Sequence, residues 1–239
     1  MNLILFEAAE IDRPLPCDDP RAVHLLRVLR RREGDTFDAG VIDGPRGRGT
    51  LMAVGPDALI LTFAWGPAPP PLDPLTLILG LPRPQTARDI LRDATALGVA
   101  AMHFVTTEKG EPSYLRSKLW SSGGWRQHLI AGAAQAFATR LPEVSHGRSL
   151  LEAVSRLPDG IARIALDNYE AETSLARLVL PPAGAVALAL GAERGWSAPE
   201  RAVLRAGGFA FAHLGPRVLR TETAVTVAVA LTRAKREWP

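Results

Sequence analysis

Residues 185–224 read AVALALGAERGWSAPERAVLRAGGFAFAHLGPRVLRTETA, and they carry the clearest indication of the fold class. Its pattern predicts an apolar strand, a glycine loop, a helix, a second apolar strand and a second glycine loop. The helix is predicted to begin at Ser197, because Ser197 and Glu200 have capping-box spacing, and to end at the pair Gly207 and Gly208. Two strand ends therefore deliver glycine loops to one edge of a sheet, where α/β proteins bind ligands.

Strands and helices alternate along the chain from residue 75 onward. This alternation indicates a mainly parallel sheet with helices on both faces, so the predicted fold class is α/β. The last segment carries Val225, Val227 and Val229 in strand-like alternation, but its length, alanines and basic end favour a helix that begins at a Thr221 cap. The predicted strands cover residues 75–79, 101–105, 161–166, 185–190 and 209–213, and the predicted helices cover 85–97, 125–139, 150–156, 197–206 and 222–236.

A proline-rich stretch, GPAPPPLDP at residues 66–74, separates this half from an unlike N-terminal half. The N-terminal half contains short strand-like runs broken by Gly/Pro turns, together with one helix over residues 20–31 for which Asp19 is the cap. A small β-barrel carrying one helix fits this pattern. We therefore expect a first domain over residues 1–66, a linker over 67–74 and a second domain over 75–239. The strand-like runs are 3–6, 36–42, 49–54 and 58–63.

The composition is ordinary for a soluble globular enzyme, with 47% hydrophobic and 22% charged residues in a chain of 239. No apolar run is long enough to span a bilayer and no basic leader opens the chain, so we expect a cytoplasmic protein without a membrane partner. The single cysteine, Cys17, excludes an internal disulfide and a cysteine cluster. Because the five histidines show no ligand spacing, we also expect no metal site.

The net charge of +3 is carried almost entirely by arginine, which suits phosphate recognition because the guanidinium group bonds two oxygens at once. Compositional bias explains such a charge equally well, so local clustering is the stronger signal. The lone His24 either contacts RNA or, as we favour, packs with the leucines of its helix. The candidate RNA-binding residues are His24, Arg27, Arg30, Arg31 and the neighbouring Arg32, and Arg46 and Arg48 in a Gly/Pro turn.

LGAERGWSAPE at residues 190–200, followed by HLGPRVLRTETA at 213–224, resembles the two C-terminal motifs of the RsmE family. Members of this family are SPOUT-superfamily methyltransferases that modify N3 of a uridine in small-subunit (16S) ribosomal RNA. The second motif matches closely. In the first motif, residues 191–195 read GAERG where the family usually has GPEGG, so the proline is absent and an arginine replaces a glycine.

The rest of the chain resembles the family less evenly. HLLRVLR at residues 24–30, followed by EGD at 33–35 and DG at 43–44, is similar to the pattern of its N-terminal PUA-like barrel. The middle departs from the family. Thr86, Arg88 and Asp93 stand in the region where a lysine and a glutamate are usual, and residues 134–140 read AQAFATR in place of a Glu-Gln-x-x-Arg run.

The resemblance implies a PUA-like β-barrel followed by a SPOUT α/β domain with a trefoil knot at its cofactor site, S-adenosylmethionine as the cofactor, and a homodimer. The alanine-rich helix surface around residues 129–137 would allow close packing between subunits. Glu193 and Glu222 would be polar contacts to the cofactor. The cofactor-binding residues that the resemblance implies are Leu166, Leu190, Gly191, Glu193, Gly195, Leu214, Gly215, Val218, Leu219, Thr223 and Ala224.

Methylation of uridine N3 requires loss of the imide proton, so a cation near the base oxygens would help. Arg220 is the first candidate and Arg217 the second, with Glu222 as the catalytic carboxylate beside Arg220. A structural ion pair between Arg220 and Glu193 or Glu222 is the competing interpretation. Three tryptophans are candidates for stacking on the base, namely Trp120, Trp125 and Trp196, and Trp196 is the best placed. Trp196 either stacks on the base or packs against the following helix.

Three other functions compete with this interpretation. The interpretation as a nucleotide-dependent oxidoreductase has weak support, because GAERG lacks the G-x-G-x-x-G spacing. A non-catalytic RNA-binding or ribosome-assembly factor that retains the fold is motivated by Arg194 and by the altered middle region. A paralogue with a changed RNA target is the third alternative. In the favoured interpretation, the partner is ribosomal RNA, either free or within the small ribosomal subunit.

Overall fold

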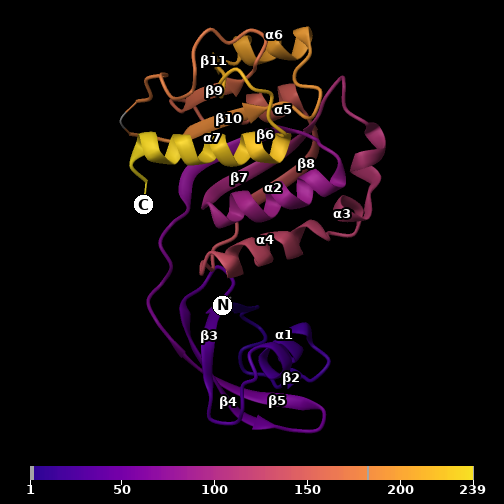
Figure 1. The fold of residues 1–239 in the computed structure, drawn as a ribbon, viewed down its shortest axis with the longest axis vertical. Helices are drawn as coiled ribbons and strands as arrows, with labels where there is room; N and C mark the ends of the chain where they lie inside the picture. Colours follow the sequence, from indigo (N-terminus) through magenta and orange to yellow (C-terminus); the bar gives the residue numbers. More distant parts are fainter. Residues whose placement is uncertain (1–2, 182, 239) are drawn as a thin grey trace. The chain divides into compact units, whose positions relative to one another are not determined.

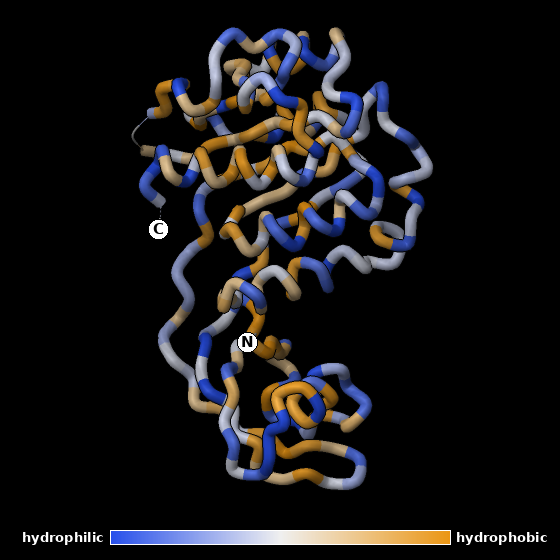
Figure 2. The backbone as a smooth tube through the Cα atoms, viewed as in Figure 1, coloured by the Kyte–Doolittle hydropathy of each residue, from blue (hydrophilic) through white to orange (hydrophobic). Residues whose placement is uncertain are grey.

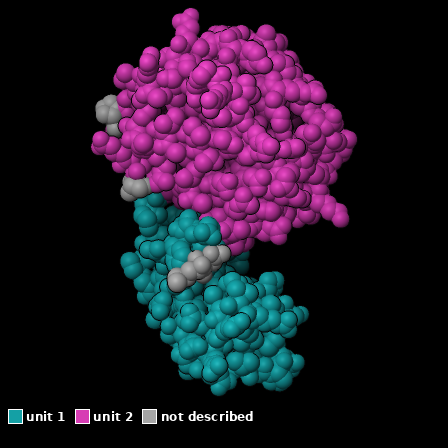
Figure 3. Space-filling model, viewed as in Figure 1, with its two compact units in different colours: residues 1–71, 133–141 teal, residues 72–132, 142–239 magenta. Residues whose placement is uncertain are grey.

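The computed structural model describes residues 3–181 and 183–238, and the chain forms two compact units (Figure 3). Unit 1 contains the residues up to Pro71 together with Ala133–Leu141, and unit 2 contains Leu72–Gly132 and the residues from Pro142 onward. The predicted boundaries assigned Ala133–Leu141 to the second domain, whereas the structure joins this segment to unit 1 by hydrogen bonds. The amide of Asp43 donates to the Thr139 carbonyl at 2.8 Å, and the Thr139 hydroxyl donates to the Gly44 carbonyl at 2.6 Å.

Unit 1 contains a five-stranded sheet with the order β1-β3-β4-β5-β2. β1 pairs with β3 in parallel and the other pairs are antiparallel. Each predicted strand run is present, but β4 begins at residue 46, so Arg46 and Arg48 lie on a strand and not in the predicted turn. The strands are β1 (Ile4–Phe6), β2 (Leu15–Pro16), β3 (Thr36–Val41), β4 (Arg46–Val54) and β5 (Ala58–Trp65).

The helix of unit 1 is shorter than predicted. It begins as α1 (Pro20–Val23), where the Asp19 carboxylate accepts the Arg21 amide at 2.8 Å, and continues as one π-helical stretch, η1 (His24–Val28). Arg30 has a φ of 53°, a left-handed conformation that cannot continue a right-handed helix. Leu25 is fully buried with Phe6, Phe37 and other apolar residues of the sheet, so this helix closes the core of unit 1.

Unit 2 contains a six-stranded parallel sheet with the order β11-β9-β10-β6-β7-β8. β10 lies between β9 and β6, and its five residues are all buried, which agrees with the hydrophobic colour of the central strands in Figure 2. β8 was not predicted from the sequence. The strands are β6 (Asp73–Gly80), β7 (Val99–Thr106), β8 (Glu143–Ser149), β9 (Ala162–Leu166), β10 (Val186–Leu190) and β11 (Ala210–Ala212).

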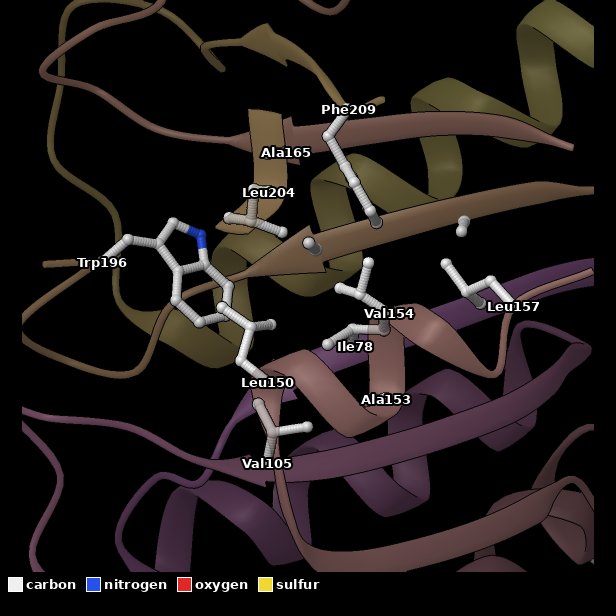
Figure 4. Packing of buried hydrophobic residues seen from close by; sticks show 12 residues of the cluster. Ile78, Val105, Leu150, Ala153, Val154, Leu157, Ala165, Trp196, Leu204 and Phe209 are labelled. Atoms are coloured by element: carbon white, nitrogen blue, oxygen red, sulfur yellow. The ribbon is translucent and has the colours of Figure 1, made fainter. Parts of the chain in front are cut away.

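Helices cover both faces of this sheet, as the alternating pattern predicted. α2 packs beside α7 on one face (Figure 1), and α5 and α6 contribute Val154 and Leu204 to a buried cluster with Ile78 of β6 on the other (Figure 4). No helix within the described residues is long and apolar enough to cross a membrane. The helices are α2 (Pro84–Ala96), η2 (Pro112–Arg116), α3 (Lys118–Ser121), α4 (Trp125–Gln135), α5 (Leu150–Ser155), α6 (Ala198–Ala206) and α7 (Thr221–Arg236).

The structure confirms one predicted helix end and corrects two others. α6 has the predicted capping box, because the Ser197 hydroxyl accepts the Glu200 amide at 3.3 Å and the Glu200 carboxylate accepts the Ser197 amide at 2.7 Å. α7 begins at Thr221 with Arg220 as its N-cap, so the predicted Thr221 cap is wrong by one residue. α4 ends at Gln135 and not at residue 139, because Phe137 has a φ of 54°.

Small residues of α4 pack within the chain. A Cβ atom on Gly132 would lie 2.2 Å from the Arg92 carbonyl oxygen of α2, so this glycine allows α4 to approach α2 closely. Leu129 and Ala133 are buried as well. The buried part of the predicted subunit-packing surface is therefore used for internal packing, and it gives no support for a homodimer.

Candidate functional site

A cavity of about 800 Å³, which we call the main pocket, lies at the carboxyl ends of β9, β10 and β11. Its walls are residues 167–169 after β9, residues 191–195 after β10, residues 213–220 after β11, and the first turn of α7. These ends meet because the chain first adds β7 and β8 on one side of β6 and then builds β9, β10 and β11 on the other. Such a reversal of strand order leaves a crevice at the sheet edge.

The main pocket brings together nearly all the residues of the predicted cofactor site. Both catalytic candidates, Arg220 and Glu222, also line it. Thr223 is the exception, because it is exposed and not among the lining residues, so the predicted contact of Thr223 is not supported. The predicted cofactor-binding residues that line the pocket are Leu166, Leu190, Gly191, Glu193, Gly195, Leu214, Gly215, Val218, Leu219 and Ala224.

The loop after β10 folds tightly on itself at Gly191. A Cβ atom on Gly191 would lie 2.7 Å from the Cα and carbonyl carbon of Gly195, a distance that real Cβ atoms do not reach. Gly195 has a φ of 62°, and its amide donates to the Ala192 carbonyl at 2.8 Å. The loop also packs closely against Gly80 at the end of β6, since a Cβ atom on Gly80 would lie 2.5 Å from the Ala192 nitrogen. The loop is therefore preformed by glycines, although it lacks the usual proline.

Glu193 ties this loop to the start of α2. Its carboxylate accepts the backbone amide of Arg83, the N-cap of α2, at 3.0 Å. Arg83 in turn donates from Nε to the Thr86 hydroxyl at 3.1 Å, and both residues line the main pocket. Arg83 was not predicted, and Thr86 was noted only as a departure from the family, because no local pattern indicates a contact between residues 110 positions apart.

A buried ion pair shapes the loop after β9. Asp167 Oδ2 accepts Arg201 Nε at 2.8 Å, and Asp167 Oδ1 accepts the amides of Tyr169 and Glu170, each at 2.8 Å. The pair is nearly inaccessible, with Asp167 5% and Arg201 8% exposed. The Arg201 guanidinium also lies 5.2 Å from the centre of the Tyr169 ring, which is 81% exposed at the pocket rim. None of these residues was predicted.

The loop after β11 is fixed by backbone hydrogen bonds to the segment between β9 and β10. The His213 amide donates to the Thr173 carbonyl and the Leu175 amide donates to the His213 carbonyl, both at 2.9 Å. His213 Nδ1 accepts the Gly215 amide at 3.0 Å, so in this arrangement Nδ1 carries no proton. Gly215 has a φ of 115°, a conformation open to glycine alone, and it turns the chain toward α7.

Arg220 stands at the N-terminus of α7 with no side-chain cap on the helix. Within the described residues, the side chains of Arg220 and Glu222 form no ion pair or hydrogen bond with protein groups, so the competing ion pairs of Arg220 are not formed. The main-chain amides of the first turn of α7 also give this end a partial positive charge. Exposed arginines at residues 83, 194, 217 and 220 line the same pocket, together with the carboxylates of Asp167, Glu193 and Glu222.

Trp196 is fully buried in the cluster between the sheet and α5 and α6 (Figure 4). Its role is therefore to pack the start of α6, and the alternative that it stacks on a base is wrong. Trp120 is also buried, 4.8 Å between ring centres from Phe104, and Trp125 is half-buried. The exposed aromatic side chain at the main pocket is instead Tyr169.

The candidate RNA-binding residues of unit 1 differ in the exposure of their side chains and in their hydrogen bonds to other protein groups. Arg27, Arg30 and Arg32 are exposed, whereas Arg31 and His24 are half-buried. On β4, the Arg48 guanidinium pairs with Asp38 at 2.8 Å and donates to the Thr36 hydroxyl, and Arg46 donates to the Phe137 carbonyl at 2.8 Å. Within the described part of the chain, no three His, Cys, Asp or Glu side chains are grouped as metal ligands.

Residues 68–233 match a family model described as an RNA methyltransferase domain. The chain is 36% identical over 243 residues to ribosomal RNA small subunit methyltransferase E of Treponema pallidum, an alignment that covers 98% of this chain and 91% of that protein. It is 31% identical to the protein of the same name from Synechocystis sp., over 90% of this chain and 71% of that one.

A crystal structure of ribosomal RNA small subunit methyltransferase E from Neisseria gonorrhoeae, bound to S-adenosyl methionine, has the same fold. The TM-score is 0.77 at 24% sequence identity, and the match covers 98% of this chain and 97% of that one. The sequence comparisons and the structure comparison thus point to the same family as the two motifs that line the main pocket. The chain belongs to the family of ribosomal RNA small subunit methyltransferase E.

Proposed function

We propose that this protein transfers a methyl group from S-adenosylmethionine to N3 of a uridine in small-subunit ribosomal RNA. The observation that carries the proposal is the main pocket, where the three loops after β9, β10 and β11 gather the residues of both family motifs. The names of the relatives support ribosomal RNA as the substrate. The choice of N3 and of uridine comes from the resemblance of residues 213–224 to the family motif.

The residues of the main pocket fit S-adenosylmethionine. A volume of about 800 Å³ is sufficient for a cofactor of this size and leaves room for a base beside it. Leu166, Leu190, Leu214 and Leu219 offer an apolar surface for the adenine ring, and the tight turn at Gly191 leaves backbone atoms open to its polar edge. When bound, this cofactor supplies an electrophilic methyl group.

The protein's own contribution is to favour the deprotonated base. Loss of the imide proton places negative charge on the base oxygens, and Arg220 together with the uncapped N-terminus of α7 stabilises negative charge at that place. Glu222 lies in the first turn of α7 and lines the same pocket. Its carboxylate has no protein partner among the described residues, so it is available to accept the proton. Glu193 is already engaged by Arg83, so its role is to position the loop.

The finer features of the fold belong to the same proposal. A trefoil knot at the cofactor site follows from the resemblance; the segment between β9 and β10, which would belong to it, is hydrogen-bonded to His213 and, through the Ala176 carbonyl at 2.8 Å, to Lys235 of α7. A PUA-like barrel in unit 1 would recruit RNA through Arg27 and Arg30, whose side chains are exposed. A homodimer and a cytoplasmic location follow from the resemblance.

The test is transfer of a labelled methyl group to free small-subunit ribosomal RNA and to assembled small subunits, with calorimetry of S-adenosylmethionine binding. We expect micromolar or tighter cofactor binding and incorporation into at least one of the two substrates. Binding of RNA without binding of the cofactor would instead support a non-catalytic assembly factor. Cofactor binding with incorporation only into another RNA would indicate a paralogue with a changed target.

A further inference from the structure

A second cavity, of about 310 Å³, lies against the same glycine loop, and we call it the side pocket. It shares Arg83, Ala192, Glu193, Arg194 and Gly195 with the main pocket, so residues 192–195 line both cavities. The rest of its wall comes from the end of β6, the loop after β7 and η2. These further lining residues are Leu81, Thr107, Lys109, Gly110, Glu111 and Tyr114.

Hydrogen bonds connect the segments that form the wall of the side pocket. The Glu108 amide donates to the carboxylate of Glu200 at 2.8 Å, and Glu200 is only 6% exposed. Lys109 Nζ donates to the Trp196 carbonyl at 3.2 Å and reaches the Arg194 carbonyl at 3.4 Å. These bonds join the loop after β7 to α6 and to the loop after β10, so they connect the two sides of the side pocket.

The polar groups of the side pocket favour an anionic ligand. Each carboxylate in its wall is already bonded to the backbone, since Glu193 accepts the Arg83 amide and Glu111 accepts the Ser113 amide at 3.2 Å. That backbone bond, aided by the nearby charges of Arg116 and Arg194, holds the pKa of Glu111 below its ordinary value. The Arg194 guanidinium has no protein partner among the described residues, and Arg83 uses only its Nε. Both guanidinium groups are thus free to bind phosphate.

Tyr114 supplies the only aromatic ring among the residues that line this cavity. It is half-buried in η2, whose first turn is fixed by the Glu111 cap. An aromatic ring in a small basic cavity is the arrangement with which proteins hold one base of a single-stranded RNA, by stacking on the ring and bonding to the phosphate. The volume of about 310 Å³ suits one nucleotide and is too small for a folded peptide or a helix.

We infer that the side pocket holds the nucleotide next to the methylated uridine, with its base on Tyr114 and its phosphate on Arg83 and Arg194. This inference rests on the proposed function. The methylated base itself has to enter the main pocket, where the methyl donor binds, and a base that leaves the stack parts from its neighbour. Because residues 192–195 line both cavities, adjacent nucleotides of one strand are able to occupy the two pockets together. Arg194, which departs from the family motif, would then contribute to the RNA site.

The test compares Tyr114→Ala with Tyr114→Phe, which keeps the ring, and with Arg116→Ala, which removes an exposed charge from the same helix outside the pocket lining. We expect Tyr114→Ala to raise KM for the ribosomal substrate by roughly 5- to 150-fold, the range for loss of one stacked base. Its kcat and its affinity for S-adenosylmethionine should stay near wild type. Tyr114→Phe and Arg116→Ala should stay within about twofold of wild type in KM.

Ultraviolet crosslinking of the wild-type complex, followed by mass spectrometry, identifies the nucleotide joined to the peptide that contains Tyr114. We expect a nucleotide adjacent to the methylated uridine. An unchanged KM for Tyr114→Ala, equal losses in Tyr114→Phe, or a crosslink to a distant nucleotide would overturn the inference. These outcomes differ from failure of the proposed function, in which the wild-type protein itself transfers no methyl group to ribosomal RNA.

Discussion

Two exposed arginines of unit 1 contrast with one buried arginine of unit 2. In unit 1, Arg27 and Arg30 are exposed and form no ion pair within the described residues. In unit 2, Arg201 is 8% exposed and bonds to the equally buried Asp167. Exposed guanidinium groups attract the phosphates of any RNA strand, and that attraction depends on salt. A buried guanidinium bonded on several sides instead fixes the backbone around it.

This difference predicts a division of labour between the units. Variants of the exposed arginines of unit 1 should change how strongly the protein holds RNA and how steeply that affinity depends on salt. Variants of Arg220 and of the glycines at positions 191 and 195 in the main pocket of unit 2 should change turnover or cofactor affinity and leave the salt dependence alone. Substitutions in each unit therefore test the contrast separately.

The largest effect is expected for Arg220→Ala. Its guanidinium is proposed to stabilise charge that develops only as the base loses its proton, so kcat should fall by roughly 100- to 1,000-fold. KM for RNA and the affinity for S-adenosylmethionine should change little. Single-turnover methyl transfer measures the effect, with Arg217→Ala as the matched control at the same rim and a smaller expected loss. A normal rate in Arg220→Ala would refute the assignment of chemistry to this residue.

The glycine loop offers a second comparison, between two positions of one loop. Gly191→Ala should weaken cofactor binding by roughly 100-fold or more, because its Cβ would meet the Gly195 backbone at 2.7 Å. Gly195→Ala should cost roughly 5- to 30-fold, because it has open space and only the strain of a φ of 62°. Calorimetry on the folded variants decides the matter. Equal affinities would mean that the tight turn does not form the cofactor cradle.

In unit 1, the double variant Arg27→Ala/Arg30→Ala should weaken RNA binding. The log–log salt slope should fall by roughly one unit for each phosphate that the variant no longer binds. We choose this pair because Arg31 is half-buried and is a poorer candidate for a phosphate contact. Binding of S-adenosylmethionine should stay as in the wild type. If cofactor affinity falls and the salt slope does not, the division between the units is wrong.

The smallest effect concerns the stability of unit 1 in acid. Hydrogen bonds from Arg21 hold the pKa values of the Glu10 and Asp19 carboxyl groups below their ordinary values. Carboxylates with a lowered folded pKa contribute stability above their unfolded pKa, and that stability is lost as the pH falls through the folded value.

Arg21→Met removes this source of stability and should cost about 1 kcal/mol or less at neutral pH, since the groups are partly exposed. The loss of stability of the full chain between about pH 5 and pH 3 should become shallower than in the wild type. Thermal unfolding at several pH values measures it. An unchanged acid slope would show that this cluster does not stabilise unit 1.

Local patterns in the sequence predicted contacts correctly where the two contacting residues are close along the chain. Ser197 and Glu200 lie three residues apart, and their capping box was predicted. Contacts between distant residues were not, and these include Asp167 with Arg201 and the Glu193 carboxylate with Arg83. Periodicity carries no information about such pairs, because they depend on which strand ends meet.

Strand pairing also decided features that propensity missed. β8 reads EVSHGRS, which lacks the apolar alternation of a strand, and its residues are at most half-buried. It forms because its backbone pairs with β7 at the sheet edge. Trp196 shows that residue type alone does not predict a role. The sequence allowed this side chain either to stack on a base or to pack in the core, and only its complete burial distinguishes the two.

The main pocket is proposed to methylate N3 of a uridine in small-subunit ribosomal RNA, and the modified RNA itself reports on this directly. The decisive measurement is mass-spectrometric mapping of that RNA from a strain lacking the gene, before and after treatment with the purified protein and S-adenosylmethionine. We predict one uridine that is unmethylated in the deletion strain and gains a single N3 methyl group on treatment, at a rate lowered by Arg220→Ala. Ribosomal RNA whose methylation is the same in both strains and unaltered by the protein would contradict the proposal.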